Sequence, residues 1–215
     1  MNAHGVPKHD LRTQAGWAGR TRSSTMPRRS CLTVPGSSEQ MLARSADTDS
    51  DMVVLDLEDS VPHSGKELAR ERVIHAIRSH DWSGRVVGVR VNGWATPWTV
   101  ADVLRLVDGC GERLDVLVLP KAEDAAMVQA LDLVLGQAEH AAGLTAGGIG
   151  LEVQIESAGG VQQLHAISVA SPRLEAIALG PLDLMASLGM PTHTQVSRHR
   201  LDPIASAIVV AGRAA

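Results

Sequence analysis

Short apolar runs alternate with longer segments of helical periodicity along most of the chain. The runs are rich in Val, Leu and Ile, and each has the length of a buried strand. They occupy residues 30–34, 52–57, 85–91, 115–119, 149–155 and 175–180. The fourth helical segment carries one apolar stripe, at Met127, Ala130, Leu131, Val134 and Ala138. This alternation predicts six βα units and a parallel sheet or barrel covered by helices.

Capping residues predict where several helices begin. The segments "SSEQ" at 37–40 and "SGKE" at 64–67 have the capping-box form, in which Ser is followed three residues later by Gln or Glu. Thr96 and Pro97 are predicted to be the N-cap and first residue of another helix. The last helix is predicted to begin near Asp202.

The first 27 residues differ from the rest of the chain. They mix Gly, Pro, His, Arg, Ser and Thr without a period, which predicts a disordered segment over residues 1–27. The sequence from Met26 would itself make a natural translation start, so the start at Met1 or Met26 stays open. Residues 28–215 are predicted to form one domain.

Composition and charge narrow the classes of partner. A net charge of −4, without a cluster of basic and aromatic residues, argues against nucleic acid. No apolar run approaches the ~18 residues of a membrane span, no signal peptide is recognisable, and Cys31 and Cys110 form no disulfide framework. We therefore expect a cytoplasmic protein. Phe and Tyr are absent and Trp numbers four, so we expect charge and backbone to hold an anionic substrate.

Polar residues stand where the predicted strands end. The segment "VVLDLEDSVP" at 53–62 carries three carboxylates, which indicates a bound cation, basic side chain or ligand among them, a carboxyl held protonated, or a solvated strand end. The later strands end in further polar residues. Because parallel strands place their C-terminal ends on one edge, these side chains should converge. The set comprises Asp56, Glu58, Asp59, Arg90, Asn92, Lys121, Glu156 and Asp183.

The residue types at this edge predict a metal and an anion site. Glu156 and Asp183 lie one βα unit apart, and Mg²⁺ commonly takes one or two carboxylates together with waters and substrate oxygens. Asp56, Glu58 and Asp59 are then expected to accept hydrogen bonds from metal-bound waters. Arg90 offers a planar fork for a substrate carboxylate. Taken singly, each residue has a structural alternative as a helix cap or a surface ion pair.

A second anchor for an anion is predicted after Glu156. In "SAGG", Gly159 and Gly160 leave backbone N–H groups uncovered at a helix start.

Six motifs together resemble the citrate lyase beta-subunit-like family of acyl-CoA lyases, within the HpcH/HpaI aldolase/citrate lyase group and related to malyl-CoA and citramalyl-CoA lyases. The resemblance runs in order from about Arg28 to the end of the sequence. The motifs are "RRSCLTVPGSSEQMLARS", "DMVVLDLEDSVP", "VVGVRVNGWATPW", "LDVLVLPKAED", "GLEVQIESAGGV" and "EAIALGPLDLMASLGM".

The resemblance implies a (β/α)8 barrel fold and a homo-oligomer, a trimer or hexamer. It implies Mg²⁺ on Glu156 and Asp183, a substrate carboxylate on Arg90, and Glu58 and Asp59 in the same catalytic site. It further implies that Arg29, before the first strand, approaches the CoA phosphates. The implied reaction is reversible cleavage of a 3-hydroxy-acyl-CoA into an acyl-CoA and a 2-oxo acid.

Three departures from the family pattern bear on activity. Thr33 replaces the usual aromatic residue and Arg44 a frequent lysine. No residue matches the family's last two βα units and its C-terminal catalytic Asp. The resemblance therefore predicts a C-terminally truncated barrel over 28–215, with negligible turnover by this chain. Two alternatives stay open, a 2-oxo acid aldolase on free substrates and an inactive binding or assembly subunit.

Overall fold

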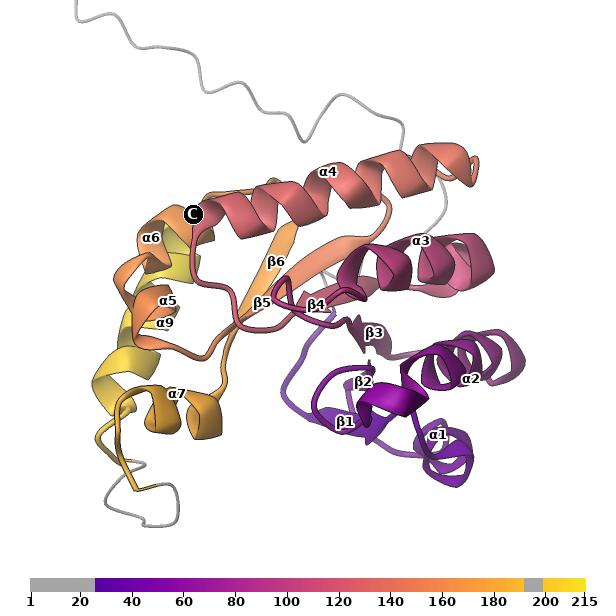
Figure 1. The fold of residues 1–215 in the computed structure, drawn as a ribbon, viewed down its shortest axis with the longest axis horizontal. Coiled ribbons are helices and arrows are strands. Elements are labelled where there is room, and N and C mark those ends of the chain that lie inside the picture. Colours follow the sequence, from indigo (N-terminus) through magenta and orange to yellow (C-terminus); the bar gives the residue numbers. More distant parts are fainter. Residues whose placement is uncertain (1–25, 192–198) are drawn as a thin grey trace, which may run out of the picture.

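Six parallel strands pair in chain order to form one sheet (Figure 1). The computed structural model describes residues 26–191 and 199–215. The predicted strands are all confirmed, each to within one residue at either end. They are β1 (Cys31–Pro35), β2 (Met52–Asp56), β3 (Val86–Arg90), β4 (Val116–Leu119), β5 (Gly150–Ile155) and β6 (Leu174–Leu179).

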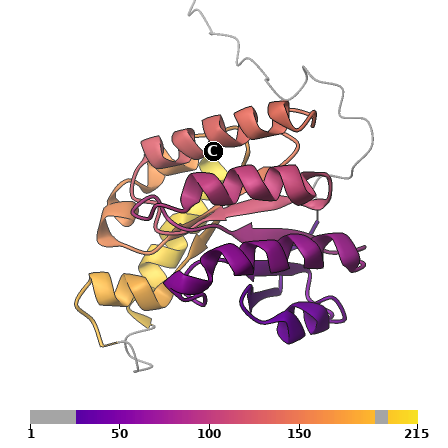
Figure 2. The same cartoon turned by 45° about the vertical axis from the view of Figure 1, so that its right-hand side comes forward.

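Helices follow the strands and pack side by side around the outer side of the sheet (Figures 1 and 2). Consecutive helices contact one another from α1 to α4, and α6 then joins α4 to α9, which packs on β6. The helices are α1 (Glu39–Ser45), α2 (Lys66–Ser79), α3 (Thr99–Cys110), α4 (Ala125–Ala141), α5 (Ala158–Gln162), α6 (Leu164–Ser168), α7 (Pro181–Ser187) and α9 (Asp202–Ala214), with short 3₁₀ turns at His63–Gly65 and Gly111–Arg113. In the described residues, no helix combines the length and apolarity needed to cross a membrane.

Alternation along the strands gives the sheet two different faces. Odd-numbered residues such as Val53, Leu55 and Val87 pack in the large core beneath the helices. Even-numbered residues of β2 lie on the other face, where Met52 and Val54 pack with Val86, Val116 and Val118. Met26, which the prediction assigned to a disordered segment, packs against this second cluster. Residues 1–25 of that segment lie outside the described residues.

Two of the predicted helix starts are wrong. Ser64 caps nothing, because a 3₁₀ turn precedes α2 and its N-cap is Gly65. Thr96 uses its hydroxyl to close a turn onto the carbonyl of Gly93 at 2.8 Å, and α3 begins two residues later than expected, at Thr99. Both segments form the loops around the candidate site, where turn contacts replace regular caps.

The other helix predictions are confirmed with small shifts. The cap of α1 is Ser38, which accepts from the N–H of Met41 at 3.3 Å. α9 begins at Asp202, as expected. In α4 the fully buried stripe runs through Val128, Leu131 and Leu135 and is displaced by about one position from the predicted one.

A buried ion-pair cluster joins α4 to the start of β6. Arg173 Nη1 and Nη2 donate to the two carboxylate oxygens of Glu139 at 3.0 and 2.7 Å. The same carboxylate accepts the backbone N–H groups of Gly147 and Ile149 at 2.8 and 2.9 Å. Asp132 accepts from Arg173 Nε. The cluster therefore fixes the loop into β5.

Glu139→Ala is expected to lower the free energy of unfolding by about 3 kcal/mol, because it leaves a buried guanidinium without its main partner. Urea unfolding measures this loss. Glu71→Ala is the matched control, since the pair of Glu71 with Arg105 is exposed and its loss should cost less than about 1 kcal/mol. Equal losses of unfolding free energy in the two variants would show that the buried cluster stabilises the fold no more than an exposed ion pair does.

Candidate functional site

The site is built around a buried ion pair between the last residues of β2 and β3. The sheet register places Asp56 directly beside Arg90. Arg90 Nε and Nη2 donate to Asp56 Oδ1 and Oδ2 at 2.7 and 2.8 Å. Burial alone would raise the pKa of Asp56, but the hydrogen bonds and charge of Arg90 outweigh it and lower that pKa. Asp56 is therefore ionised and holds one edge of the guanidinium.

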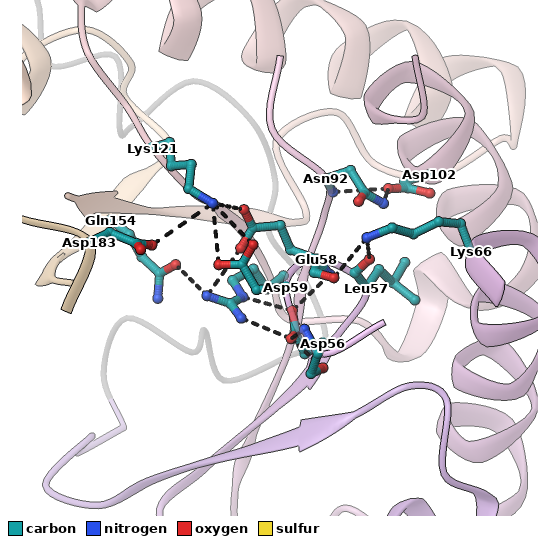
Figure 3. A network of polar contacts seen from close by, with 12 residues as sticks. Asp56, Leu57, Glu58, Asp59, Lys66, Asn92, Asp102, Lys121, Gln154 and Asp183 are labelled. Carbon is teal, nitrogen blue, oxygen red and sulfur yellow. Dashed lines mark hydrogen bonds and ion pairs between the residues drawn. The ribbon is translucent and has the colours of Figure 1, made fainter. Parts of the chain in front are cut away.

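Asp56 also shapes the loop that follows β2. Its carboxylate accepts the backbone N–H groups of Glu58 at 2.9 Å and Ser60 at 3.1 Å. From the other side, Lys66 Nζ donates to the carbonyls of Leu57 at 2.8 Å and Glu58 at 2.7 Å (Figure 3). The loop carrying the predicted catalytic acids is thus held at both ends by buried polar contacts.

Lys121 brings a positive charge among the acids at this edge (Figure 3). Its ammonium donates to Glu58 and, at 3.2 Å, to Asp59, and lies 3.9 Å from Asp183 Oδ2. Burial would lower the pKa of Lys121, but the neighbouring carboxylates raise it. The sequence placed Lys121 at the edge without giving it a role. Its backbone φ of 51°, unusual for a residue other than glycine, aims the side chain.

Glu156 is the most constrained of the acids. It follows β5, is 4% exposed, and its Oε2 atom is buried without a hydrogen-bond partner in the described part of the chain. Burial, followed by the charges of Glu58 and Asp183, raises the pKa of Glu156 to about 7. Gly180 makes room for the carboxylate, since a Cβ there would lie 2.6 Å from Glu156 Oε1.

The structure brings together all of the polar residues predicted at this edge except Asn92, which binds Asp102. Arg90 Nη1 lies 3.3 Å from Glu58 Oε2, and Glu58 and Asp183 both act on the pKa of Glu156. Burial raises the pKa of Glu58 in spite of its basic neighbours. Asp183, in the first turn of α7, is half-exposed. We call Glu58, Asp59, Glu156 and Asp183 the acid cluster.

Arg29 does not join them. It precedes β1, so it lies at the opposite end of the strands, where its Nε and Nη2 donate to Asp51 at 3.0 and 2.8 Å. The approach of Arg29 to the CoA phosphates stays a prediction, at a place away from the acid cluster. A residue before a parallel strand and one after it lie at different edges of the sheet.

The glycines after Glu156 lie at the start of helix α5, as predicted, but the N–H groups are not both free. The N–H of Gly160 is already used, because it donates to Ser157 Oγ at 3.1 Å. A Cβ on Gly160 would lie 2.5 Å from the carbonyl of Ala122, so this glycine allows close packing. Gly159 is exposed beside it. An anion anchor at these two residues stays a prediction that the Gly160 contact weakens.

The donor set fits a cation that takes few protein ligands. Among the described residues, no three His, Cys, Asp or Glu side chains form a ready metal cage. Glu156, however, has a buried oxygen without a partner and stands near a second carboxylate, Asp183. Mg²⁺ keeps several waters and binds through one or two carboxylates, which suits this pair.

Residues 29–215 match the sequence family described as HpcH/HpaI aldolase/citrate lyase. The chain is 42% identical over 166 residues to an L-malyl-CoA/beta-methylmalyl-CoA lyase of Cereibacter sphaeroides, covering 77% of this chain and 52% of the relative. It is 34% identical to the citrate lyase subunit beta of Leuconostoc mesenteroides, covering 87% of this chain and 61% of the relative. The chain therefore spans about half to three-fifths of these relatives.

The fold is similar to that of the protein CitE from Mycobacterium tuberculosis, solved in complex with magnesium, acetoacetate and coenzyme A. The TM-score is 0.67 at 25% identity, covering 89% of this chain and 63% of the solved one. This similarity and the parallel six-stranded sheet confirm the predicted fold class, a partial barrel of the TIM type.

Glu156→Gln is expected to change how stability depends on pH in metal-free buffer. The pKa of about 7 in the folded protein exceeds the ordinary 4.5, so between these values the folded state binds the proton more tightly. The contribution of Glu156 to stability is therefore largest below pH 4.5 and is lost as the pH rises through 7. Relative to the parent, the variant should gain thermal stability from pH 5 to about pH 8.

Thermal unfolding with a chelator at both pH values measures this gain. Glu71→Gln, on the exposed face of α2, is the control and should show no such pH-dependent difference. If the difference in unfolding temperature between Glu156→Gln and the parent stayed constant across this pH range, Glu156 would be ionised throughout it.

Proposed function

The chain belongs to the HpcH/HpaI aldolase/citrate lyase family, and on this premise we propose that it is a Mg²⁺-dependent carbon–carbon lyase. The proposed reaction is reversible cleavage of a 3-hydroxy-acyl-CoA thioester into an acyl-CoA and a 2-oxo acid. The observation that carries the proposal is Glu156, whose buried Oε2 atom has no hydrogen-bond partner among the described residues and whose pKa is affected by the charges of Asp183 and Arg90. Buried charges that lack partners are costly, and they are typical of sites that bind a cation and an anionic ligand.

Arg90 is proposed to bind the carboxylate of the 2-oxo acid. Asp56 occupies the Nε and Nη2 side of the guanidinium at 2.7 and 2.8 Å. Nη1 has only looser contacts, 3.3 Å to Gln154 Oε1 and 3.3 Å to Glu58 Oε2. Nη1, with the remaining hydrogen of Nη2, forms a second donor edge that matches a carboxylate. Asp56 thus fixes the guanidinium plane and leaves its outer edge for substrate.

Glu156 and Asp183 are the residues that would hold Mg²⁺. When bound there, the metal would polarise the oxo group of the 2-oxo acid and orient that acid. Glu58 and Asp59 are proposed to act as hydrogen-bond acceptors beside this pair, and Lys121 offsets their charge. Glu58, whose pKa is raised, can hold a proton at its buried Oε2 atom.

The names of the relatives support thioester substrates over free ones. The similar proteins include an L-malyl-CoA/beta-methylmalyl-CoA lyase and a citrate lyase subunit, and a similar solved structure holds coenzyme A. Because this chain spans about half of the first of these relatives, the activity and substrates of the whole protein are part of the proposal. Homo-oligomeric assembly and a cytoplasmic location stay predictions.

Glu156→Gln and Asp183→Asn are each expected to weaken Mg²⁺ binding at least about tenfold, because each removes one of two carboxylate ligands. Isothermal titration calorimetry with MgCl₂ measures this. The control is Asp108→Asn, which changes an exposed acid near the C-terminal end of α3 and should bind Mg²⁺ as the parent does. Unchanged affinity in both site variants would refute the metal site.

Arg90→Lys is expected to weaken the binding of glyoxylate, pyruvate and oxaloacetate by about 10- to 100-fold, corresponding to a charged hydrogen-bonded contact of about 1.5–3 kcal/mol. A single ammonium cannot pair with Asp56 and also present a fork to substrate. Titration of each acid in the presence of Mg²⁺ tests this, with Arg105→Lys on exposed α3 as control. Parent-like binding by Arg90→Lys would exclude the proposed bidentate contact.

A further inference from the structure

Arg90 and Lys121 both reach the acid cluster, but they differ in how firmly they are held. Arg90 is fixed to the fully buried carboxylate of Asp56 by hydrogen bonds of 2.7 and 2.8 Å. The Lys121 side chain is 44% exposed, and two of its partners, Asp59 and Asp183, are half-exposed. Lys121 can therefore move into solvent, whereas Arg90 cannot move without breaking a buried ion pair.

The ammonium of Lys121 covers acids to which the proposed function assigns the metal and its waters (Figure 3). It donates to Glu58 and, at 3.2 Å, to both carboxylate oxygens of Asp59. It also lies 3.9 Å from Asp183 Oδ2, a separation that is too long for a hydrogen bond but short enough for an ion pair. Three acids of the cluster thus share one positive charge.

Glu156 is the acid of the cluster that Lys121 leaves without a hydrogen bond. Its Oε2 atom is buried and has no hydrogen-bond partner within the described residues. A cation that binds Glu156 and Asp183 would stand close to the ammonium, because Asp183 would be a ligand of one and is already an ion-pair partner of the other. Like charges at such short range repel strongly in a partly buried site. Mg²⁺ and the ammonium therefore compete for Asp183.

The backbone fixes the base of the Lys121 side chain and leaves its tip free to move. Lys121 has a φ of 51°, a conformation that is costly for a residue other than glycine. The next residue, Ala122, is fully buried, and its N–H donates to the carbonyl of Gln154 at 3.1 Å. This turn directs the side chain toward the acid cluster (Figure 3). Strained backbone of this kind is typical of functional sites.

We infer that Lys121 is an internal counter-ion, which occupies the acid cluster in the metal-free protein and is displaced from Asp183 when Mg²⁺ binds. The inference rests on the proposed metal site. In this role Lys121 reduces the repulsion among the acids in the metal-free protein. It also sets the affinity for Mg²⁺, because the free energy needed to displace the ammonium is subtracted from the free energy of metal binding.

Isothermal titration calorimetry with MgCl₂ tests the competition. Lys121→Met keeps the length of the side chain and removes its charge, so it should bind Mg²⁺ at least about tenfold more tightly than the parent. Lys121→Arg keeps the charge and should bind Mg²⁺ as the parent does. Arg105→Met removes one positive charge from the exposed face of α3 and is the control for net charge. A damaged site would bind Mg²⁺ more weakly, so a gain in affinity reports the role of Lys121 itself.

A second measurement follows the displacement directly by NMR. The lysines of the sequence are Lys8, Lys66 and Lys121, so a chain with isotope-labelled lysine gives few signals, and Lys121→Arg identifies the signal of Lys121 by its loss. The Cε signal of Lys121 should shift toward that of free lysine when MgCl₂ is added. The Lys66 signal is the internal control and should shift far less, since its Nζ donates to the carbonyls of Leu57 and Glu58.

Three results would overturn the inference. They are Mg²⁺ binding by folded Lys121→Met that is no tighter than that of the parent, an equal gain of affinity in Lys121→Arg or Arg105→Met, and a Lys121 signal that stays in place when Mg²⁺ is bound. Each of these leaves the proposed metal site intact. If neither the parent nor Lys121→Met bound Mg²⁺, the metal site itself would be refuted and the inference with it. Thermal unfolding of each variant confirms that it is folded.

Discussion

The candidate site depends on the ion pair between Asp56 and Arg90. Two charges removed from water in this way are stable only when they satisfy each other and their remaining hydrogen-bonding atoms. Asp56 meets this requirement, because one carboxylate holds the guanidinium and also the backbone of the loop from Glu58 to Ser60. The orientation of the substrate-binding arginine and the position of the acids are therefore set by one side chain that itself has no room to touch a substrate.

Around this pair, acidic side chains outnumber basic ones, so part of their negative charge is not compensated. Lys121 offsets part of the charge of Glu58 and Asp59, while Glu156 is left with a buried oxygen and a pKa near 7. Repulsion of this kind is unfavourable in the ligand-free protein, and a bound cation would remove it.

The sequence predicted the strands and the edge at which the polar residues converge, because both follow from period and from the rule that parallel strands end together. The same rule places Arg29 at the other edge of the sheet, because this residue precedes β1. The contacts of Asn92 were not predictable, because its amide is held by Asp102 of α3, which Arg70 of α2 holds in turn. The left-handed backbone of Lys121 and the Gly160 contact likewise arise only from tertiary packing.

The opposed faces of the sheet have a consequence for how the chain reaches this structure. Asp56 and Arg90 face each other across β2 and β3 on the side away from the helices, while their neighbours Leu55 and Val89 pack beneath them. A slip of one residue in either strand would turn a charged side chain into the apolar core and a leucine or valine away from it. The pair therefore disfavours a shifted register during folding, because only the correct pairing of the two strands lets both charges be buried together.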